Sequence, residues 1–409
     1  MKKILWLSDS PATCTGYATI TKDVLNGISN TYDCCCLAHN FVGREVLPPI
    51  NFKDGTELKF SLLGNGFVRY GMDIISNEIK SRQIDIFGIL LDTFMMLEKP
   101  SGINFLNVDT SPAKTFFYFP SDGGMFPAGC EDILRKVTLP ISMSKFGRDQ
   151  VKKLFNIDAE YIPHGYDNKI YYQMSKEDKL KIKKVWGLQN KFVVGVVARN
   201  QSRKMLDRTL KAFALWCREK PDAVLLLHLD PNDPAQAFNI VTTINRYRLN
   251  NRVIMTGTSM FRPFGYDKMN EVYNLMDVFL LSTSGEGFGI PIIEAMACGV
   301  PQVVTDYTTT KELVIDDIQT GLSVLLCGEI EECPYPHTTE ILNGTITGGW
   351  EVERGIMDIY DCVKKLDILY LQPKILEEFS NNSIEKAKNY TWNKIIPEWF
   401  RVLKKLEDM

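Results

Sequence analysis

The sequence predicts an α/β protein made of two doubly wound parallel-sheet domains that face a central cleft. Short apolar segments alternate with amphipathic ones along most of the 409 residues. The apolar segments are hydrophobic at consecutive positions, which is typical of strands covered by helices on both faces. The alternation pauses in a polar, lysine-rich stretch from about 167 to 189 and then starts again. Two such series indicate two Rossmann-like units.

The first series is predicted to form an N-terminal domain over residues 1–170. Its strands are expected in KILWLS, DCCCLAH, IDIFGILL, KTFFYFP and VTLPISMS. A helix is expected from Tyr17 to about Ile28, and another in KFGRDQVKKLF after the last of these strands. The start of the chain has only four consecutive apolar residues after its lysines, which fits a first strand better than a signal peptide.

The second series is predicted to form a C-terminal domain over residues 171–389. Its strands are expected in KFVVGVVA, AVLLLHL, RVIMTG, DVFLLST and PQVVTD. Helices are expected at about Lys204–Arg218 and about Pro234–Tyr247.

The remainder of the chain is less regular. Residues 327–350 have no clear period and are interpreted as a loop or a small insertion, with helix expected again from about Glu353. The apolar spacing in residues 390–409 predicts an amphipathic helix that packs on a core or a partner.

Composition excludes several classes of function. The net charge is −3, so there is no overall basic footprint for nucleic acid or anionic lipid. No apolar run approaches the ~18 residues of a membrane span. The ten cysteines and four histidines follow no metal or disulfide spacing. No metal site and no cofactor are therefore predicted, and a cytoplasmic protein is expected, with peripheral membrane contact left open.

The stretch STSGEGFGIPIIEAMACGVPQVVTD, residues 282–306, places two glutamates around a glycine loop. Its pattern predicts a strand, a loop and then a helix from about Ile290 to Cys298, which begins near a proline and ends at a glycine. Glu286 lies in the loop, and Glu294 is placed in the first helical turn. Carboxylates suit vicinal hydroxyls and a helix N-terminus suits phosphate, so the stretch fits a nucleotide-sugar diphosphate. Alternatively, Glu294 only stabilises the helix and Glu286 is solvated.

Two cations follow the first strand of the C-terminal domain. Arg199 lies at the strand end and Lys204 at the expected helix start, so both could reach a diphosphate in the cleft. In a dry site they would stabilise the charge on a leaving phosphate. Arg203 and Arg208 are expected to point elsewhere, and a merely solvated cationic turn is the alternative.

These residues match a known family. The block GEGFGIPIIEAMACGVPQVVTD resembles the donor-site signature of retaining family 4 glycosyltransferases, the glycosyl transferases group 1, which have the two-domain GT-B fold. The segments VARNQSRK, IPHGYD and SPATCTGYATITKDVL are similar to three further family motifs, in the expected order.

The resemblance implies a role for each matching residue. Glu286 would contact hydroxyls of the donor sugar, Glu294 would hold the ribose hydroxyls, and Arg199 with Lys204 would bind the diphosphate. The nucleobase would lie near residues 257–260, and the last helix would cross back to the N-terminal domain. The other donor-binding positions that it implies are Gly16, Tyr17, Gly257, Thr258, Gly287, Phe288, Gly289 and Ile290.

The implied reaction is metal-independent, front-face transfer of a hexose from a UDP- or GDP-sugar, with retention of configuration. Catalytic roles fall to Glu286, Arg199, Lys204 and Asp122. Many family members have a histidine where this chain has Ser121 and Asp122. Asp122 could orient or deprotonate the acceptor hydroxyl, or it could belong only to a tight turn.

Three other residues are weaker candidates. His164 is expected to order the segment between the domains, whereas Asp9 and Ser10 are cleft candidates by position only. Two other functions stay open: a nucleotide-sugar epimerase on the same fold, and a non-catalytic sugar-nucleotide binding protein. The acceptor, whether glycan, lipid, protein or modified nucleobase, is not specified by the sequence.

Overall fold

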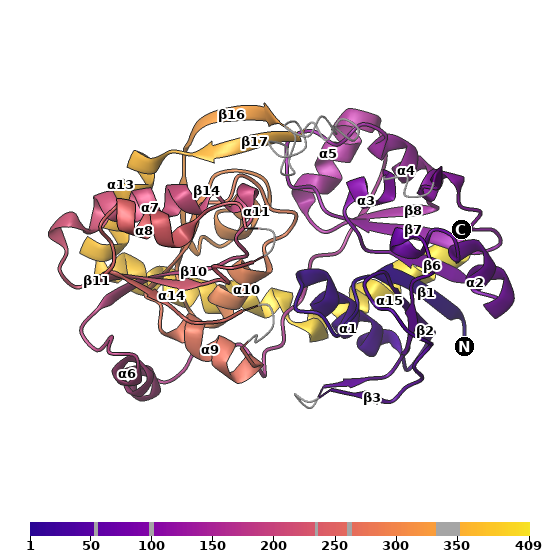
Figure 1. The fold of residues 1–409 in the computed structure, drawn as a ribbon, viewed down its shortest axis with the longest axis horizontal. Helices are drawn as coiled ribbons and strands as arrows, with labels where there is room; N and C mark the ends of the chain where they lie inside the picture. The colour runs from indigo at the N-terminus through magenta and orange to yellow at the C-terminus, as the bar shows by residue number, and fades with distance from the viewer. Residues whose placement is uncertain (53–55, 98–101, 234–235, 260–263, 333–351) are drawn as a thin grey trace.

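The computed structural model describes residues 1–409 except 53–55, 98–101, 234–235, 260–263 and 333–351. It contains two parallel sheets with helices on both faces, one in each half of the molecule (Figure 1). The predicted fold class, two Rossmann-like domains, is confirmed.

The N-terminal sheet has seven parallel strands in the order β5-β2-β1-β6-β7-β8-β9. All five segments predicted as strands are present, and the short β5 and β9 complete the sheet. The strands are β1 (Lys3–Ser8), β2 (Asp33–Ala38), β5 (Ser61–Gly64), β6 (Ile86–Ile89), β7 (Lys114–Phe119), β8 (Leu139–Ser142) and β9 (Glu160–Tyr161). A small hairpin pairs β3 (Ile50–Asn51) with β4 (Glu57–Leu58).

The C-terminal sheet has six parallel strands in the order β12-β11-β10-β13-β14-β15. Five of them were predicted, and the added β15 is short. The strands are β10 (Phe192–Val197), β11 (Ala223–His228), β12 (Val253–Met255), β13 (Val278–Leu281), β14 (Gln302–Thr305) and β15 (Gly321–Val324).

Helices cover both faces of each sheet. In the N-terminal half they are α1 (Gly16–Ile28), α2 (Ile75–Arg82), α3 (Thr93–Leu97), α4 (Cys130–Lys136) and α5 (Lys145–Phe155). The others are α6 (Lys176–Val185), α7 (Leu206–Trp216), α8 (Ile240–Arg246), α9 (Tyr266–Asn274), α10 (Ile290–Ala297), α11 (Thr309–Val314), α13 (Ile359–Leu371), α14 (Pro373–Ala387) and α15 (Trp392–Asp408). The 3₁₀ turns are Arg69–Gly71, Phe105–Asn107, Ser202–Lys204, Cys217–Glu219 and Lys388–Tyr390.

Strand β1 shows why the apolar runs are continuous. Its neighbouring side chains point to opposite faces of the sheet. Trp6 packs in the core that includes residues of α1 and α15, whereas Leu5 and Leu7 pack in the core that includes residues of α2 and α4. Both faces are therefore apolar.

The last helix, α15, returns to the N-terminal domain and lies beside α1 (Figure 1). Its Trp399 is fully buried, with ring centroids 5.4 Å from Trp6 and 4.9 Å from Tyr118. The apolar stripe predicted in residues 390–409 thus covers the N-terminal sheet. The domain boundary near residue 170 stays a prediction.

The segment after β15 differs from the prediction. Residues 327–332 of the predicted loop or small insertion belong to β16 (Leu326–Glu332), which pairs with β17 (Val352–Met357) in an antiparallel hairpin. Glu353, where a helix was expected to begin, lies in β17. The helix begins only at Ile359. The sequence pattern did not indicate strands here because part of this hairpin consists of charged residues and lacks the alternation of apolar and polar residues that marks a strand. Residues 333–350 of the predicted loop lie outside the described residues.

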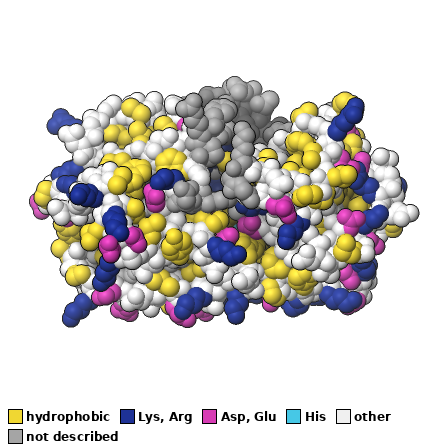
Figure 2. Space-filling model, turned by 90° about the horizontal axis from the view of Figure 1, so that it is seen from below, with side chains coloured by type: hydrophobic (Ala, Val, Ile, Leu, Met, Phe, Trp, Pro, Cys, Tyr) yellow, Lys and Arg dark blue, Asp and Glu magenta, His cyan; other side chains and the backbone are white. Residues whose placement is uncertain are grey.

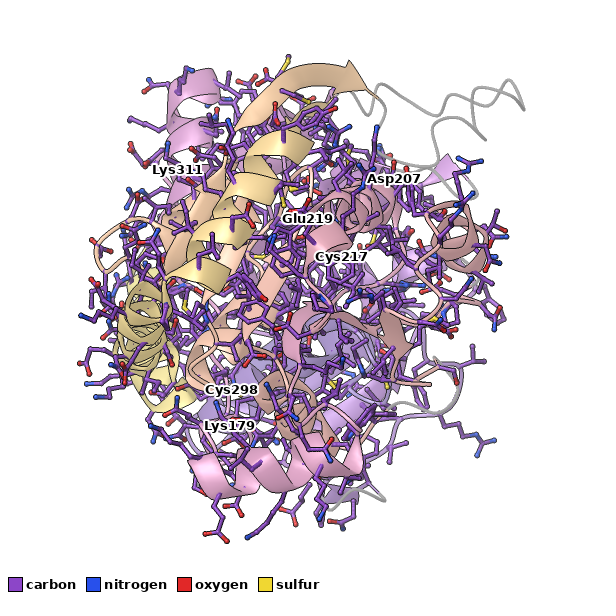
Figure 3. The ribbon with its side chains drawn as sticks, turned by 90° about the vertical axis from the view of Figure 1, so that its left-hand side faces the viewer. Lys179, Asp207, Cys217, Glu219, Cys298 and Lys311 are labelled. Carbon is purple, nitrogen blue, oxygen red and sulfur yellow. The ribbon has the colours of Figure 1, made fainter. Side chains whose placement is uncertain are left out.

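The described surface carries charges of both signs (Figure 2). Lys and Arg side chains are scattered among acidic and apolar ones on the face in Figure 2. None of the nine cysteines in the described residues forms a disulfide, and Cys217 and Cys298 lie well apart in the C-terminal domain (Figure 3). None of the helices in the described residues combines the length and apolarity that crossing a bilayer requires.

Candidate active site

The site lies at the carboxyl ends of the central strands, where ligands of open α/β sheets bind. In the C-terminal sheet the chain order reverses beside β10, which has β11 on one side and β13 on the other. Arg199 follows β10 and Glu286 follows β13. The loops that follow β10 and β13 therefore both contribute residues to the site.

The glycine loop after β13 is fixed by its neighbours. The N–H of Glu286 donates to the Thr308 hydroxyl at 3.0 Å, and the Thr309 hydroxyl donates to the Glu286 main-chain oxygen at 2.9 Å. Gly289 has φ +102°, which side chains disfavour, and it leads directly into α10. The predicted strand, loop and helix are confirmed. Glu294, however, lies in the second helical turn, not in the first.

Glu286 is buried in a cluster of two cations. Lys204 forms an ion pair with one of its carboxylate oxygens, and Arg203 approaches the other at 2.9 Å. Burial opposes ionisation of Glu286, but the two cations outweigh it and lower its pKa to about 2. Burial and the nearby Arg203 lower the pKa of Lys204 to about 8. At neutral pH both members of the pair are charged. The solvated-loop alternative for Glu286 is wrong.

Arg203 belongs to the site, against the sequence expectation. The 3₁₀ turn Ser202–Lys204 directs it toward the glycine loop, where its Nη1 also donates to the Gly285 main-chain oxygen at 3.1 Å. The sequence pattern predicts the wrong direction for the Arg203 side chain because it places the start of an α-helix at Lys204. In the structure, α7 starts at Leu206. Arg208 does point away, and donates to the Met357 main-chain oxygen at 2.9 Å.

Arg199 is half-exposed and anchored. Its Nε donates to Asp233 at 2.6 Å and its Nη2 at 3.1 Å, and the Asp233 side chain is buried. This fork holds the guanidinium at the end of β10. Sequence reasoning did not find Asp233, because a lone aspartate in a loop carries no pattern.

Glu294 faces Tyr273 of α9, whose hydroxyl donates to its carboxylate at 2.6 Å. Burial raises the pKa of Glu294 to about 7, although the tyrosine bond opposes the shift. Unlike Glu286, Glu294 has no ion-pair partner among the described residues. The two glutamates thus have opposite electrostatic settings.

Asp122 lies on the N-terminal side of the same cluster. Its carboxylate is 3.1 Å from Nη1 of Arg354 and 3.8 Å from Nε of Arg203. Its loop also meets the glycine loop, because a Cβ built on Gly287 would lie 2.6 Å from Cβ of Pro120. The structure therefore brings Asp122 and Glu286 into one charged cluster. Arg354 was not predicted, since it comes from the unrecognised β17.

The N-terminal loop completes this side of the site. Thr15 caps α1, and the following Gly16 approaches Ile290 at the start of α10, where a Cβ at position 16 would lie 3.4 Å from Cδ1 of that residue. The Tyr17 hydroxyl donates to Asp92 at 2.6 Å. Burial raises the pKa of Asp92 to about 6.

Asp9 and Ser10 are held within the same loop region. His39 lies 2.6 Å from the Asp9 carboxylate, and the N–H of Ser10 donates to Asn40 at 2.6 Å. These bonds order the loop after β1, and Asp9 is not in contact with the Glu286 cluster in any described interaction.

Phe288 and His164 pack against each other. The ring of Phe288 is buried against His164, with centroids 4.6 Å apart. The Tyr118 hydroxyl and His164 Nδ1 are 2.7 Å apart, and burial lowers the pKa of His164 to about 3. His164 therefore lies in contact with both Tyr118 and Phe288, and its expected role in ordering the segment between the domains stays a prediction.

The predicted nucleobase loop lies farther along the same edge. Gly257, with φ +78°, and the half-buried Thr258 follow β12. Met260, at the end of that predicted region, lies outside the described residues. Within the described residues, no group of three or more His, Cys, Asp or Glu is placed to hold a metal ion.

Comparison with known proteins agrees with this geometry. Residues 178–325 match the family of glycosyl transferases group 1. The chain is 30% identical to mannosylfructose-phosphate synthase of Agrobacterium fabrum over 172 residues, 41% of this chain and 36% of that protein. It is 27% identical to N-acetyl-alpha-D-glucosaminyl L-malate synthase of Bacillus anthracis over 173 residues, 42% of this chain and 41% of that protein. The matches thus span less than half of these relatives.

Solved structures extend the likeness to the whole chain. Sucrose-phosphate synthase from Thermosynechococcus elongatus has a TM-score of 0.72 over 99% of both chains, at 16% identity. A glycosyltransferase from Rickettsia africae has a TM-score of 0.68 over 99% of this chain and 98% of its own, at 14% identity. Anabaena HepE in complex with UDP and glucose has a TM-score of 0.67 over 99% of this chain and 100% of its own, at 16% identity. The chain therefore has the GT-B fold, and its residues 178–325 resemble the glycosyl transferases group 1.

Proposed function

We propose that this protein is a retaining glycosyltransferase that moves a sugar from a nucleotide-diphosphate sugar to an acceptor hydroxyl without a metal ion. The observation that carries the proposal is the buried cluster of Glu286, Lys204 and Arg203, which meets Asp122 of the other domain. Ion pairs buried this deeply are costly to assemble. Because these ion pairs lie at the carboxyl ends of the strands, where ligands bind, we take them to serve catalysis and not only stability.

The donor would lie along the C-terminal side of the site. Lys204 has three ammonium hydrogens, so its bond to Glu286 leaves donors for a phosphate oxygen. Arg199, anchored by Asp233, would bind the same diphosphate, and Glu294 would hold the ribose hydroxyls. UDP-sugars are the first donors to test, because Anabaena HepE has been solved with UDP-glucose and pneumococcal GtfA with UDP and GlcNAc.

The reaction would form one bond and break one at the anomeric carbon. The acceptor oxygen bonds to that carbon on the face from which the nucleoside diphosphate leaves with the bonding electron pair. The acceptor proton passes to the departing phosphate or to Asp122. Lys204 and Arg199 would stabilise the negative charge on the leaving group, as a metal ion does in other enzymes.

A donor panel tests this function. Purified protein is mixed with UDP-, GDP-, ADP- and dTDP-sugars in the presence of EDTA, and thermal shift and nucleotide release are measured. One donor should stabilise the protein and release nucleotide, and Glu294→Ala should weaken binding about tenfold or more. If the protein is well folded but no donor stabilises it or releases nucleotide, the proposal is contradicted. If turnover occurs without EDTA and disappears with it, metal independence is contradicted.

A further inference from the structure

Strand β17 of the C-terminal domain reaches the acceptor-side loop of the N-terminal domain. The N–H of Gly124 donates to the main-chain oxygen of Glu353 at 3.1 Å and to the Tyr307 hydroxyl at 2.9 Å. Figure 1 shows the β16–β17 hairpin at the top of the molecule, extending from the C-terminal domain toward α5. The hairpin therefore contributes directly to the region around Asp122.

Arg354, on β17, is the charged residue that this hairpin inserts. It is only 1% exposed. Its Nη1 donates to the main-chain oxygen of Asp122 at 2.6 Å and lies 3.1 Å from the carboxylate of the same residue. Nη1 carries two hydrogens, so this one nitrogen can donate to both oxygens and fix the backbone and the side chain of Asp122 together.

A pocket lies beside this pair. Its walls include Asp92, Thr93, Ser121, Asp122, Val352 and Arg354. The Arg354 Nε and the Ser121 hydroxyl are buried and have no hydrogen-bond partner among the described residues. Buried polar atoms without partners are rare, so two residues that line the pocket each keep an unsatisfied hydrogen-bonding group within the described residues.

The other nearby cation cannot take this role. Nε of Arg203 lies 3.8 Å from the Asp122 carboxylate, while its Nη1 is engaged by Glu286 at 2.9 Å and by the Gly285 oxygen. Arg203 thus belongs mainly to the donor-side loop, and Arg354 is the closer partner of Asp122.

We infer that Arg354 is a positioning residue for the transfer reaction: it holds the Asp122 carboxylate at the pocket, where a hydroxyl-bearing acceptor binds. This inference rests on the proposed function. It makes the β16–β17 hairpin part of the acceptor site, although the hairpin belongs to the donor-side domain.

The test compares Arg354→Met and Arg354→Lys in the full chain with a matched control, Arg208→Met. Arg208 also donates to a main-chain oxygen of the hairpin, that of Met357, but it does not line the pocket. Two quantities are measured: the affinity for the nucleoside diphosphate by calorimetry, and kcat and KM for nucleotide release with water as the acceptor. The donor is whichever of UDP-, GDP-, ADP- or dTDP-glucose the unmodified protein turns over.

Arg354→Met should lower kcat about tenfold or more, while KM and nucleotide affinity change less than about twofold. Arg354→Lys should lower kcat about threefold or more, because the lysine side chain is one bond shorter and its ammonium nitrogen would not reach the position of Nη1. Arg208→Met should match the unmodified protein in kcat. If Arg354→Met does not fold, the lysine variant decides.

The inference alone is overturned by an unchanged kcat in Arg354→Met, by an unchanged kcat in Arg354→Lys, or by a loss that Arg208→Met shares. A parallel loss of nucleotide affinity in Arg354→Met overturns it as well, because Arg354 would then act on the donor. If the unmodified protein neither binds nucleotide nor releases it, the proposed function fails and the inference fails with it.

Discussion

Gly285 of the C-terminal domain faces the main-chain oxygen of Asp122 in the N-terminal domain so closely that a Cβ at position 285 would lie 1.9 Å from that oxygen. Only a glycine allows the two loops to meet at this distance. The contact lies between the Glu286 cluster and the Asp122–Arg354 pair. The separation of the donor-side and acceptor-side groups therefore depends on the absence of one side chain.

Gly285→Ala should push the two loops apart and lower kcat for sugar transfer by about 10²-fold, because small displacements of reacting groups are costly. Steady-state nucleotide release measures this. Gly187→Ala is the control: Gly187 has φ +69° but nothing within 4 Å of an added Cβ, so it tests glycine replacement without a close approach. Equal kcat in Gly285→Ala and the unmodified protein would show that the contact does not set the geometry.

Glu286→Gln should destabilise the protein by about 3–5 kcal/mol, because Lys204 and Arg203 lose their buried carboxylate. Urea denaturation measures the change. The exposed pair of Lys181 and Glu177 supplies the comparison, and Glu177→Gln should leave the midpoint unchanged. Similar midpoints for the unmodified protein and Glu286→Gln would mean that the cluster contributes little to stability.

The pKa of Glu294, raised to about 7 from an ordinary 4.5, predicts a pH dependence of stability. Between these two values the folded state binds more protons than the unfolded state, so this residue lowers stability as pH rises from about 4.5 to 7. Thermal melts of the unmodified protein and Glu294→Gln across this range should diverge, with the variant losing less stability. Parallel curves would contradict the shift.

The same residue predicts a pH dependence of binding. If the Glu294 carboxylate accepts hydrogen bonds from ribose hydroxyls, nucleotide affinity should rise with pH through about 7. Calorimetry with UDP between pH 5.5 and 8.5 measures this, at pH values taken about 1.5 units either side of that pKa. In Glu294→Gln the rise should be absent, and a rise that persists there would assign it to another group.

Trp399→Ala should destabilise the protein by about 3–5 kcal/mol, because the ring is fully buried against Trp6 and Tyr118. Urea denaturation checks this, with the exposed Tyr360→Ala as the control for loss of a large side chain. A small effect would mean that α15 contributes little to the N-terminal core.

Much of the fold could be predicted from local sequence. The continuous apolar runs of β1 and β10 indicate strands covered on both faces, and Pro291 with Gly299 marks the limits of α10. The positions of Glu286, Arg199 and Lys204 after strands also follow from the pattern, because carboxyl ends of parallel strands share one edge of a sheet. The short β5 and β15 and the charged part of β16 gave too weak a pattern to be recognised.

The sequence by itself determined most strands of the two sheets, several of their helices and the glutamate-bearing loop, because these depend on periodicity and on the backbone preferences of glycine and proline. Only the tertiary structure decided which charges meet. Arg354 bonds to Asp122 across 232 positions of the chain, and the 3₁₀ turn at Ser202–Lys204 directs Arg203 to Glu286. Such pairings depend on how distant parts of the chain pack together, and a local pattern of residues does not show which of these parts meet.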